Sequence, residues 1–265
     1  MWNLPPPPGF QGFDPDKPVS MYVRHLPHWR QDGATYFVTF RLNDSLPQAK
    51  LDELDQIRRE WERQHPPPHS TKVGRFCKPS GKPGRFEKPS GKPGRFEKPS
   101  GKPGRFEKPS YSNAQLEQLS QETMQRVERW LDQGMGSCRL KDHSAAKMVV
   151  DAMHYFDGER YELDSYVVMP NHVHGIVRPL ACAEEPLERV LQSWKRHTSR
   201  EINRHFGLTG HLWQEESFDR IIRDGEHLWR ALQYIGANPS KVGLAREQCP
   251  IWVRPQWVKP GWKFE

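Results

Sequence analysis

Two histidines one residue apart, His172 and His174, lie in the apolar run MPNHVHGIV at 169–177. In a β-strand, side chains at positions i and i+2 project from the same face. Two imidazoles on one face can each offer a nitrogen to a divalent cation. The alternative is a pair of ordinary packed histidines without a ligand. The pattern therefore indicates part of a metal site, and a third ligand from a neighbouring element has to complete it.

A tyrosine and an asparagine near the C-terminus are the candidates to complete such a site. In the predicted helix DGEHLWRALQYIGANP, Tyr234 and Asn238 lie four residues apart and hence one turn apart. A phenol can act as a nucleophile, and an amide oxygen can bind a hard cation. His227 lies on the same stripe and is a candidate proton acceptor. The alternatives are a tyrosine packed at a helix–sheet boundary and an asparagine that ends the helix before Pro239.

The segment 186–206 predicts a long amphipathic helix with a basic side. Opposite its apolar stripe lie Arg189, Arg196, Arg200 and Arg204, with Lys195 nearby. Arginines without alternating acids suit contacts with a phosphate backbone, although such a stripe is also typical of a solvated face. The ten tryptophans offer further surfaces on which unpaired bases could stack.

The elements that position these residues follow from the hydrophobic pattern. Apolar alternation predicts strands at 35–42, 161–168, 172–177 and 217–222. Helices are predicted at about 48–64, 113–132, 143–156, 186–206 and 225–238. When the helices next to the repeat segment described below are set aside, the order is β-α-β-β-α-β. This order predicts an α+β fold: a ferredoxin-like antiparallel sheet with helices on one face and a C-terminal helix that carries Tyr234.

A ten-residue repeat, GRFCKPSGKP and then GRFEKPSGKP, occupies 74–110. It holds seven Lys and four Arg against three Glu, or +8, so the rest of a chain with net charge +7 is formally −1. Its composition predicts a disordered basic insertion at 66–112, with a phosphate-binding arm as the alternative. We therefore divide the chain into a proline-rich segment at 1–19, a domain at 20–245 interrupted by this insertion, and a tryptophan-rich tail at 246–265.

Composition also bears on the compartment and on membranes. Four scattered cysteines form no C-x-x-C pair, which argues against a zinc ribbon or a disulfide framework and favours the cytoplasm. No apolar run approaches the roughly 18 residues of a membrane helix, and MWNLPPPPGF does not resemble a secretory signal. We expect a cytoplasmic protein without a membrane partner.

Several of these segments together resemble a known family. YVVMPNHVHGIV, SWKRHTSREIN, GHLWQEESFDRIIRD and LQYIGANPSKVGL follow one another as in the single-tyrosine HUH transposases. The resemblance is closest to the REP-associated tyrosine transposases of bacteria. It covers roughly 20–64 and 140–245, and it leaves out the N-terminus, the repeats and the tail.

The resemblance implies a role for each candidate residue. His172, His174 and Asn238 would bind Mg²⁺ or Mn²⁺, and Tyr234 would attack single-stranded DNA that carries a hairpin. The attack would leave a 5′-phosphotyrosine bond and a free 3′-hydroxyl. Relatives include monomers and homodimers, so both states stay open. The competing hypotheses are a regulator that binds DNA or RNA hairpins without cutting them, and a metal hydrolase that uses water as its nucleophile.

Overall fold

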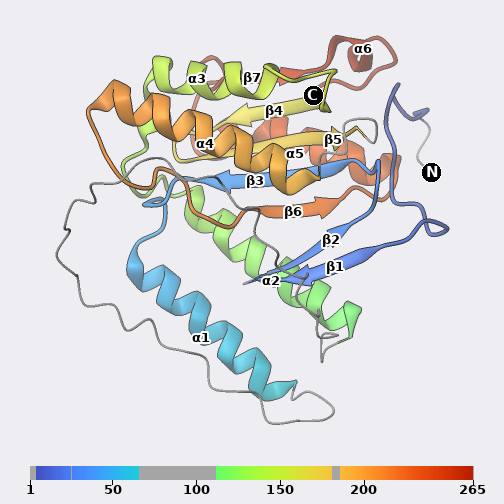
Figure 1. Ribbon diagram of the computed structural model, residues 1–265, viewed down its shortest axis with the longest axis horizontal. Coiled ribbons are helices and arrows are strands. Elements are labelled where there is room, and N and C mark those ends of the chain that lie inside the picture. The colour runs from blue at the N-terminus through green and yellow to red at the C-terminus, as the bar shows by residue number, and fades with distance from the viewer. Residues whose placement is uncertain (1–3, 25, 66–111, 181–185, 265) are drawn as a thin grey trace, which may run out of the picture.

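A five-stranded antiparallel sheet forms the centre of the protein, as the computed structural model shows (Figure 1). The structure describes residues 4–24, 26–65, 112–180 and 186–264. The strands run in the order β6-β3-β5-β4-β7. Their bounds are Tyr36–Arg41 for β3, Tyr161–Val168 for β4, His172–Pro179 for β5, Phe218–Ile221 for β6 and Ile251–Val253 for β7. Helices and an antiparallel sheet in one body confirm the α+β class.

Helices cover both faces of this sheet (Figure 1). The helices α3 (His143–His154) and α4 (Leu187–Phe206) lie on one face, and α5 (Gly225–Lys241) lies on the other. Because successive side chains of a strand point to opposite faces, the sheet has one hydrophobic core on each face. Val38 and Phe40 pack in the core under α3 and α4, whereas Phe37 packs in the core under α5. The placement of α5 puts its tyrosine on the face that is opposite the basic helix.

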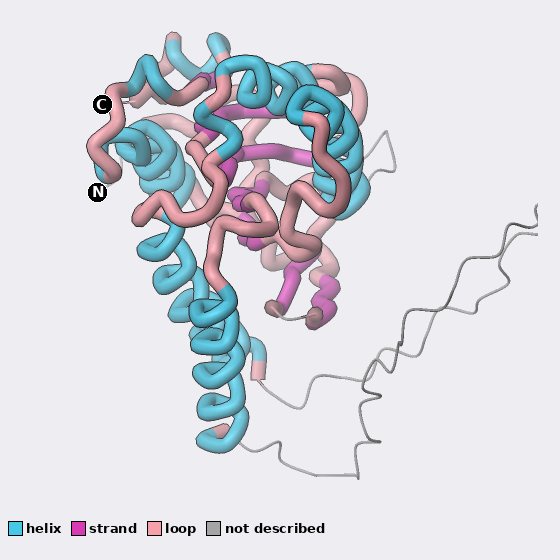
Figure 2. Tube along the Cα trace, turned by 90° about the vertical axis from the view of Figure 1, so that its left-hand side faces the viewer, coloured by secondary structure: helices cyan, strands magenta, loops and turns pink. Residues whose placement is uncertain are grey.

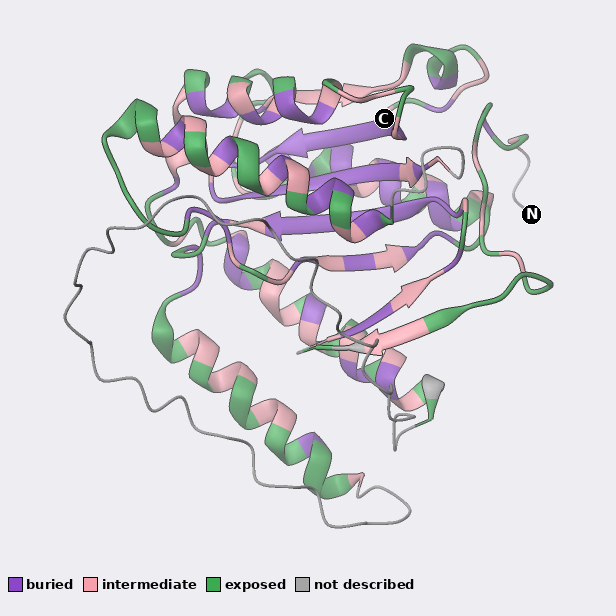
Figure 3. Ribbon diagram, viewed as in Figure 1, coloured by how far each residue is buried: buried purple, intermediate pink, exposed green. Residues whose placement is uncertain are grey.

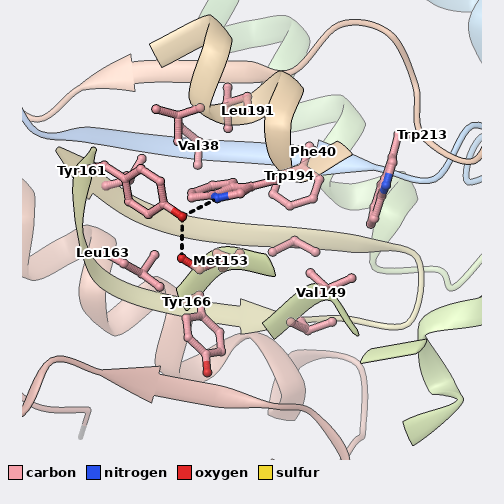
Figure 4. Packing of buried hydrophobic residues seen from close by; sticks show 14 of the residues in the cluster. Val38, Phe40, Val149, Met153, Tyr161, Leu163, Tyr166, Leu191, Trp194 and Trp213 are labelled. Carbon is pink, nitrogen blue, oxygen red and sulfur yellow. Dashed lines mark hydrogen bonds between the residues drawn. The ribbon is translucent and has the colours of Figure 1, made fainter. Parts of the chain in front are cut away.

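Aromatic side chains hold α4 against the sheet (Figure 4). The indole N–H of Trp194 donates to the Tyr161 hydroxyl at 2.8 Å, and this hydroxyl donates to the carbonyl of Met153 at 2.8 Å. Trp194 and Tyr161 are almost wholly buried, so both polar groups need these partners. The chain of bonds connects α4, β4 and α3 and keeps this face of the sheet closed.

The helix α5 extends past its predicted end. It passes through Pro239 and continues to Lys241. Asn238 therefore lies inside the helix, and the interpretation of this residue as a helix terminator is wrong. Ile235, Gly236, Asn238 and Pro239 are all buried, so packing holds the last turn in spite of the missing proline N–H.

Two further helices form an arm on one side of the body (Figure 2). They are α1 (Gln48–Gln64) and α2 (Asn113–Leu131), and Trp61 packs with Leu116 and Leu119 where their outer ends meet. The predicted repeat insertion at 66–112 lies outside the described residues, apart from Ser112, the N-cap of α2. Its two flanks are held together by this contact.

The segments at the two ends of the chain pack against the domain. A hairpin of β1 (Ser20–Val23) and β2 (Pro27–Arg30) follows the proline-rich segment, and β7 and α6 (Pro255–Val258) lie in the tryptophan-rich tail. One-turn 3₁₀ helices occur at Arg139–Lys141 and Arg246–Gln248. The indoles of Trp257 and Trp262 are wholly buried and donate to the carbonyls of Pro8 and Pro5, each at 2.9 Å. The tail thus adds an edge strand and part of the core.

Burial follows the layered arrangement (Figure 3). The strands β3, β4 and β5 are buried along almost their whole length, whereas α1 is largely exposed. Among the described helices, none has the length and apolar character that crossing a membrane requires.

Candidate metal and nucleophile site

The histidine pair lies on β5 in the middle of the sheet and faces α5. Nε2 of His172 and Nε2 of His174 are 3.0 Å apart, and both side chains are almost completely buried. Val173 between them packs on the opposite face with the core under α3 and α4. The two histidine side chains thus project from the same face of β5, as the H-x-H spacing predicts.

Each imidazole is held by a partner on its other nitrogen. Nδ1 of His172 lies 2.7 Å from Oδ1 of Asn171, and Nδ1 of His174 lies 2.8 Å from the Thr39 hydroxyl. Asn171 itself donates its amide protons to the carbonyls of Leu131 and Met135. Its Oδ1 is therefore an acceptor, so His172 carries its proton on Nδ1 and presents a lone pair on Nε2. Such outer partners orient histidines that bind metals.

Burial keeps both imidazoles uncharged. It lowers the pKa of His172 to about 3 and the pKa of His174 well below its usual value. A neutral imidazole is the form that binds a cation, because protonation removes the donor lone pair. At neutral pH the pair can therefore act as ligands without first losing a proton.

Tyr234 lies on α5 directly against this pair. Its ring meets the His174 ring edge to face, with centroids 5.1 Å apart, and it meets Phe37 in the same way at 5.9 Å. The Lys241 ammonium lies 3.7 Å from the centroid of the Tyr234 ring. The tyrosine that the sequence analysis singled out thus packs against one of the two histidines, and its role as a nucleophile stays a prediction.

Asn238, one turn after Tyr234, is wholly buried. Its amide is close enough to the Tyr234 hydroxyl to lower the pKa of that phenol. Within the described residues, however, neither Oδ1 nor Nδ2 has a hydrogen bond of ordinary geometry. A buried polar group without a partner costs free energy, and native proteins rarely leave one unexplained. An amide oxygen in this state is available to bind a cation.

Glu128 on α2 is the residue that the sequence reasoning missed. Its carboxyl group hydrogen bonds to the Tyr234 hydroxyl. Burial raises the pKa of Glu128 to about 7. Burial and then the Glu128 charge raise the pKa of the Tyr234 phenol well above its usual value. A tyrosine in this environment stays protonated until a neighbouring base accepts its proton, and Glu128 is placed to do so.

The two histidine nitrogens are spaced as two ligands of one divalent cation would be. Two nitrogens bound at right angles, each about 2.1 Å from a metal, lie about 3.0 Å apart, and this is the separation of the two Nε2 atoms. The described part of the chain contains no cluster of three or more His, Cys, Asp or Glu that could hold a metal. His172, His174 and Asn238 with solvent would therefore have to form the site. The amide oxygen suits Mg²⁺ or Mn²⁺, whereas imidazole nitrogens are typical ligands of Zn²⁺ and other transition metals, so the expected Mg²⁺ or Mn²⁺ stays a prediction.

His227 lines the same cavity as Tyr234 but, unlike Glu128, it does not hydrogen bond to the Tyr234 hydroxyl. Its Nδ1 accepts a hydrogen bond from the backbone N–H of Arg223 at 3.1 Å. Its buried Nε2 has no partner among the described residues, and its ring lines a cavity that also contains Tyr234. Its role as a proton acceptor stays a prediction, and Glu128 is the carboxyl that contacts the hydroxyl.

The basic residues predicted to bind nucleic acid lie on α4, on the sheet face opposite the histidine pair. Arg189, Arg196, Arg200 and Arg204 are exposed, as the sequence pattern predicts. Arg200 and Arg204 both pair with Glu201. Lys195 donates to the carbonyls of Gln214 and Glu215, and burial lowers its pKa to about 8. The structure does not bring this set to the Tyr234 site, so any contact with nucleic acid would be separate.

Comparisons with known proteins give one distant structural match. No protein-family model matches this chain, and no curated protein matches it. A solved structure, described as a REP-associated tyrosine transposase bound to a REP hairpin, aligns with 86% of this chain and 76% of that chain. The sequence identity is 14% and the TM-score is 0.31. A similarity of this size is too low to assign a function, so the proposed function rests on the geometry of the site.

Proposed function

We propose that this protein cleaves and rejoins single-stranded DNA through a covalent bond between Tyr234 and a 5′-phosphate. The observation that carries the proposal is the Tyr234 ring packed against His174, whose Nε2 lies 3.0 Å from that of His172. The buried amide of Asn238 lies one turn away and has no hydrogen bond of ordinary geometry among the described residues. The sequence motifs that resemble REP-associated tyrosine transposases contain these same residues. Hairpin-bearing single strands are the substrate that this resemblance suggests.

We also assign the sheet to the ferredoxin-like arrangement. The strand order β6-β3-β5-β4 has α3 before β4 and α4 between β5 and β6, as a β-α-β-β-α-β unit requires. The strand β7 extends this unit at one edge. This arrangement sets β5 in the middle of the sheet, so the histidine pair is held by a strand on each side.

In the proposed reaction each residue has a defined task. Oη of Tyr234 attacks the scissile phosphorus, the bond between phosphorus and the 3′ oxygen breaks, and a new Oη–phosphorus bond forms. The phenol proton passes to Glu128, and the departing 3′ oxygen takes up a proton from solvent and leaves as a hydroxyl; in rejoining, the attacking 3′-hydroxyl returns a proton to solvent. A cation held by His172, His174 and Asn238 would stabilise the charge that develops on the phosphate oxygens.

Rejoining follows from the same groups. The covalent bond to Tyr234 keeps the phosphodiester energy, so a 3′-hydroxyl can displace the tyrosine and reseal a strand without ATP. Glu128 then returns the proton to Oη of Tyr234. Phe37 and the Lys241 ammonium restrict the position of the ring during both steps.

A hairpin-binding regulator without cleavage activity is the second candidate. The observation that favours it is the 3.0 Å contact between the two Nε2 atoms, since a hydrogen bond between them would also explain two packed histidines without a cation. In that case the Thr39 hydroxyl would donate to Nδ1 of His174, and Nε2 of His174 would carry the proton. The two candidates differ in whether a covalent adduct forms.

The test uses single-stranded hairpin DNA pools labelled at the 5′ or the 3′ end, incubated with Mg²⁺, Mn²⁺ or EDTA. Denaturing gels should show a metal-dependent adduct on the 3′-labelled fragment, absent from Tyr234→Phe. Binding without an adduct, equal in wild type and variant, would support the regulator. Free fragments without an adduct would support a hydrolase that uses water. Cytoplasmic location and the choice between monomer and homodimer stay predictions.

A further inference from the structure

A cavity of about 510 Å³ opens beside Tyr234, between α2, β6 and α5. Its apolar side consists of Phe37, Ala231 and the Tyr234 ring, and its polar side contains Arg220, Arg223 and Arg230. Cavities of this size commonly hold a small molecule or one unit of a polymer. Tyr234 and the three arginines thus line one cavity that is open to solvent.

Arg220 is the arginine of this cavity that lies on the central sheet. It lies on β6 opposite Phe37, and Thr39, two residues further along β3, lies opposite His174. Because the side chains of strand residues two apart share a face, Arg220 lies on the same side of the sheet as the histidine pair. The buried Nε of Arg220 has no hydrogen-bond partner among the described residues. A guanidinium with an unfilled donor is a ready partner for an anion.

The other two arginines lie at the rim and are paired only at the surface. Arg223 forms an ion pair with Glu117, and Arg230 pairs with Glu226 at 3.2 Å. The side chains of Arg223 and Arg230 are 58% and 66% exposed, and exposed ion pairs of this kind are weak. An incoming phosphate could therefore compete for either guanidinium at a small free-energy cost.

The three acidic residues of the cavity, Glu117, Glu128 and Asp224, already interact with groups of the protein. The Asp224 carboxylate accepts the backbone N–H of His227 at 2.7 Å and caps α5. Glu117 already pairs with Arg223, and burial raises the pKa of Glu128 to about 7, which makes this carboxyl partly neutral. His227 adds a further buried nitrogen, Nε2, without a partner among the described residues. Nε of Arg220 and Nε2 of His227 are thus the buried nitrogens of the cavity that a ligand oxygen could still satisfy.

We propose that this cavity binds the phosphodiester of the nucleotide next to the scissile phosphate, with Arg220 as its inner ligand and Arg223 and Arg230 at the rim. The inference rests on the proposed function, because it treats Tyr234 as the residue that attacks the neighbouring phosphate. The ligand class is a single-stranded nucleic acid backbone. Phe37 and Ala231 give the attached sugar or base an apolar wall.

The test measures binding without cleavage. Tyr234→Phe protein is titrated with a fluorescein-labelled oligothymidylate of 12 nucleotides at several salt concentrations, and anisotropy gives the affinity. Adding Arg220→Gln is expected to lower affinity about tenfold, as for one lost charge-assisted contact. The slope of log affinity against log salt should fall by about 0.7, the value for one phosphate contact on a single strand. The matched control is Arg129→Gln, an exposed arginine on α2 that does not line the cavity.

Arg230→Gln covers the case in which loss of Arg220 prevents folding, because Arg230 is exposed and its removal leaves the core intact. A reduced affinity and slope for Arg220→Gln or Arg230→Gln, relative to Arg129→Gln, supports the subsite. Affinity and slope equal to those of the control, in a folded protein, overturn it. The covalent-adduct assay is independent: a missing adduct with arginine effects present rejects cleavage and leaves the cavity as a binding site for the nucleic acid backbone. A normal adduct without arginine effects rejects the subsite alone.

Discussion

Replacement of Glu128 by glutamine should slow adduct formation and at the same time stabilise the fold above neutral pH. Glutamine keeps the shape of the side chain but cannot take the Tyr234 proton. A positioned general base contributes about 100-fold or more to a rate, so we expect adduct formation to slow by about 100-fold. In the wild type the rate should rise with pH through about 7, where the Glu128 carboxyl ionises, and the variant should lack this rise.

The stability effect follows from the raised pKa of Glu128. Its carboxyl changes from an ordinary pKa of 4.5 to about 7 on folding. Between these values the folded protein holds a proton that the unfolded chain has lost, so the free energy of unfolding decreases as pH rises through this range. A shift of about 2.5 units corresponds to roughly 3 kcal/mol. Glutamine avoids this loss, so the variant should be more stable than wild type at pH 8 by up to about 3 kcal/mol.

The assay combines single-turnover adduct formation with urea unfolding at pH 5 and pH 8. Asp132→Asn is the matched control, because Asp132 lies one turn further along the chain and burial raises its pKa also, but the residue does not hydrogen bond to Tyr234. The control should gain stability in the same direction and keep its rate within a few fold. A wild-type rate and pH profile in Glu128→Gln would refute the role of Glu128 in proton transfer. A variant less stable than wild type at pH 8 would refute the stability argument.

Three further predictions concern the metal, the tail and the repeats. Thr39→Val removes the partner of Nδ1 of His174 and should weaken Mn²⁺ binding about tenfold by calorimetry; unchanged binding would contradict the assigned outer contact. Trp257→Ala should lower the free energy of unfolding by about 3–5 kcal/mol, because a wholly buried indole and its bond to Pro8 are lost; a change under about 1 kcal/mol would show that the tail packs elsewhere. Replacing 66–111 by a short Gly-Ser linker should leave the affinity for single-stranded DNA and its salt slope unchanged, since Trp61 and Leu116 already join the flanks. A lower affinity with a smaller slope would instead identify a phosphate-binding arm.

The sequence predicted the elements whose own periodicity is strong. The strand β4 and the helix α1 have the predicted bounds, because apolar residues repeat there at the period of a strand or of a helix. The hairpin of β1 and β2 and the edge strand β7 were missed. They are three or four residues long and depend on partners far along the chain, such as Asp219, whose Oδ1 lies 2.6 Å from Nδ1 of His28.

Some residues of the candidate site could be predicted from local sequence spacing, and others could not. His172 with His174 and Tyr234 with Asn238 could be predicted because each pair lies on one element, where local spacing decides which side chains share a face. Glu128 and Arg220 could not be predicted from such spacing. They reach the site only through the packing of α2 and β6 around α5, and α2 begins just after a segment whose composition predicts disorder. A buried carboxyl beside a phenol is a tertiary property without a local pattern.

The most direct test of the central proposal is to locate the covalent bond. Protein incubated with hairpin-bearing single-stranded DNA and Mn²⁺ is digested with nuclease and protease, and the peptides are measured by mass spectrometry. We expect the peptide that contains Tyr234 to carry a nucleotide joined through its 5′-phosphate, and we expect no such peptide after treatment with EDTA. A modified peptide at any other tyrosine, or a DNA product with no modified peptide, would contradict the proposed function.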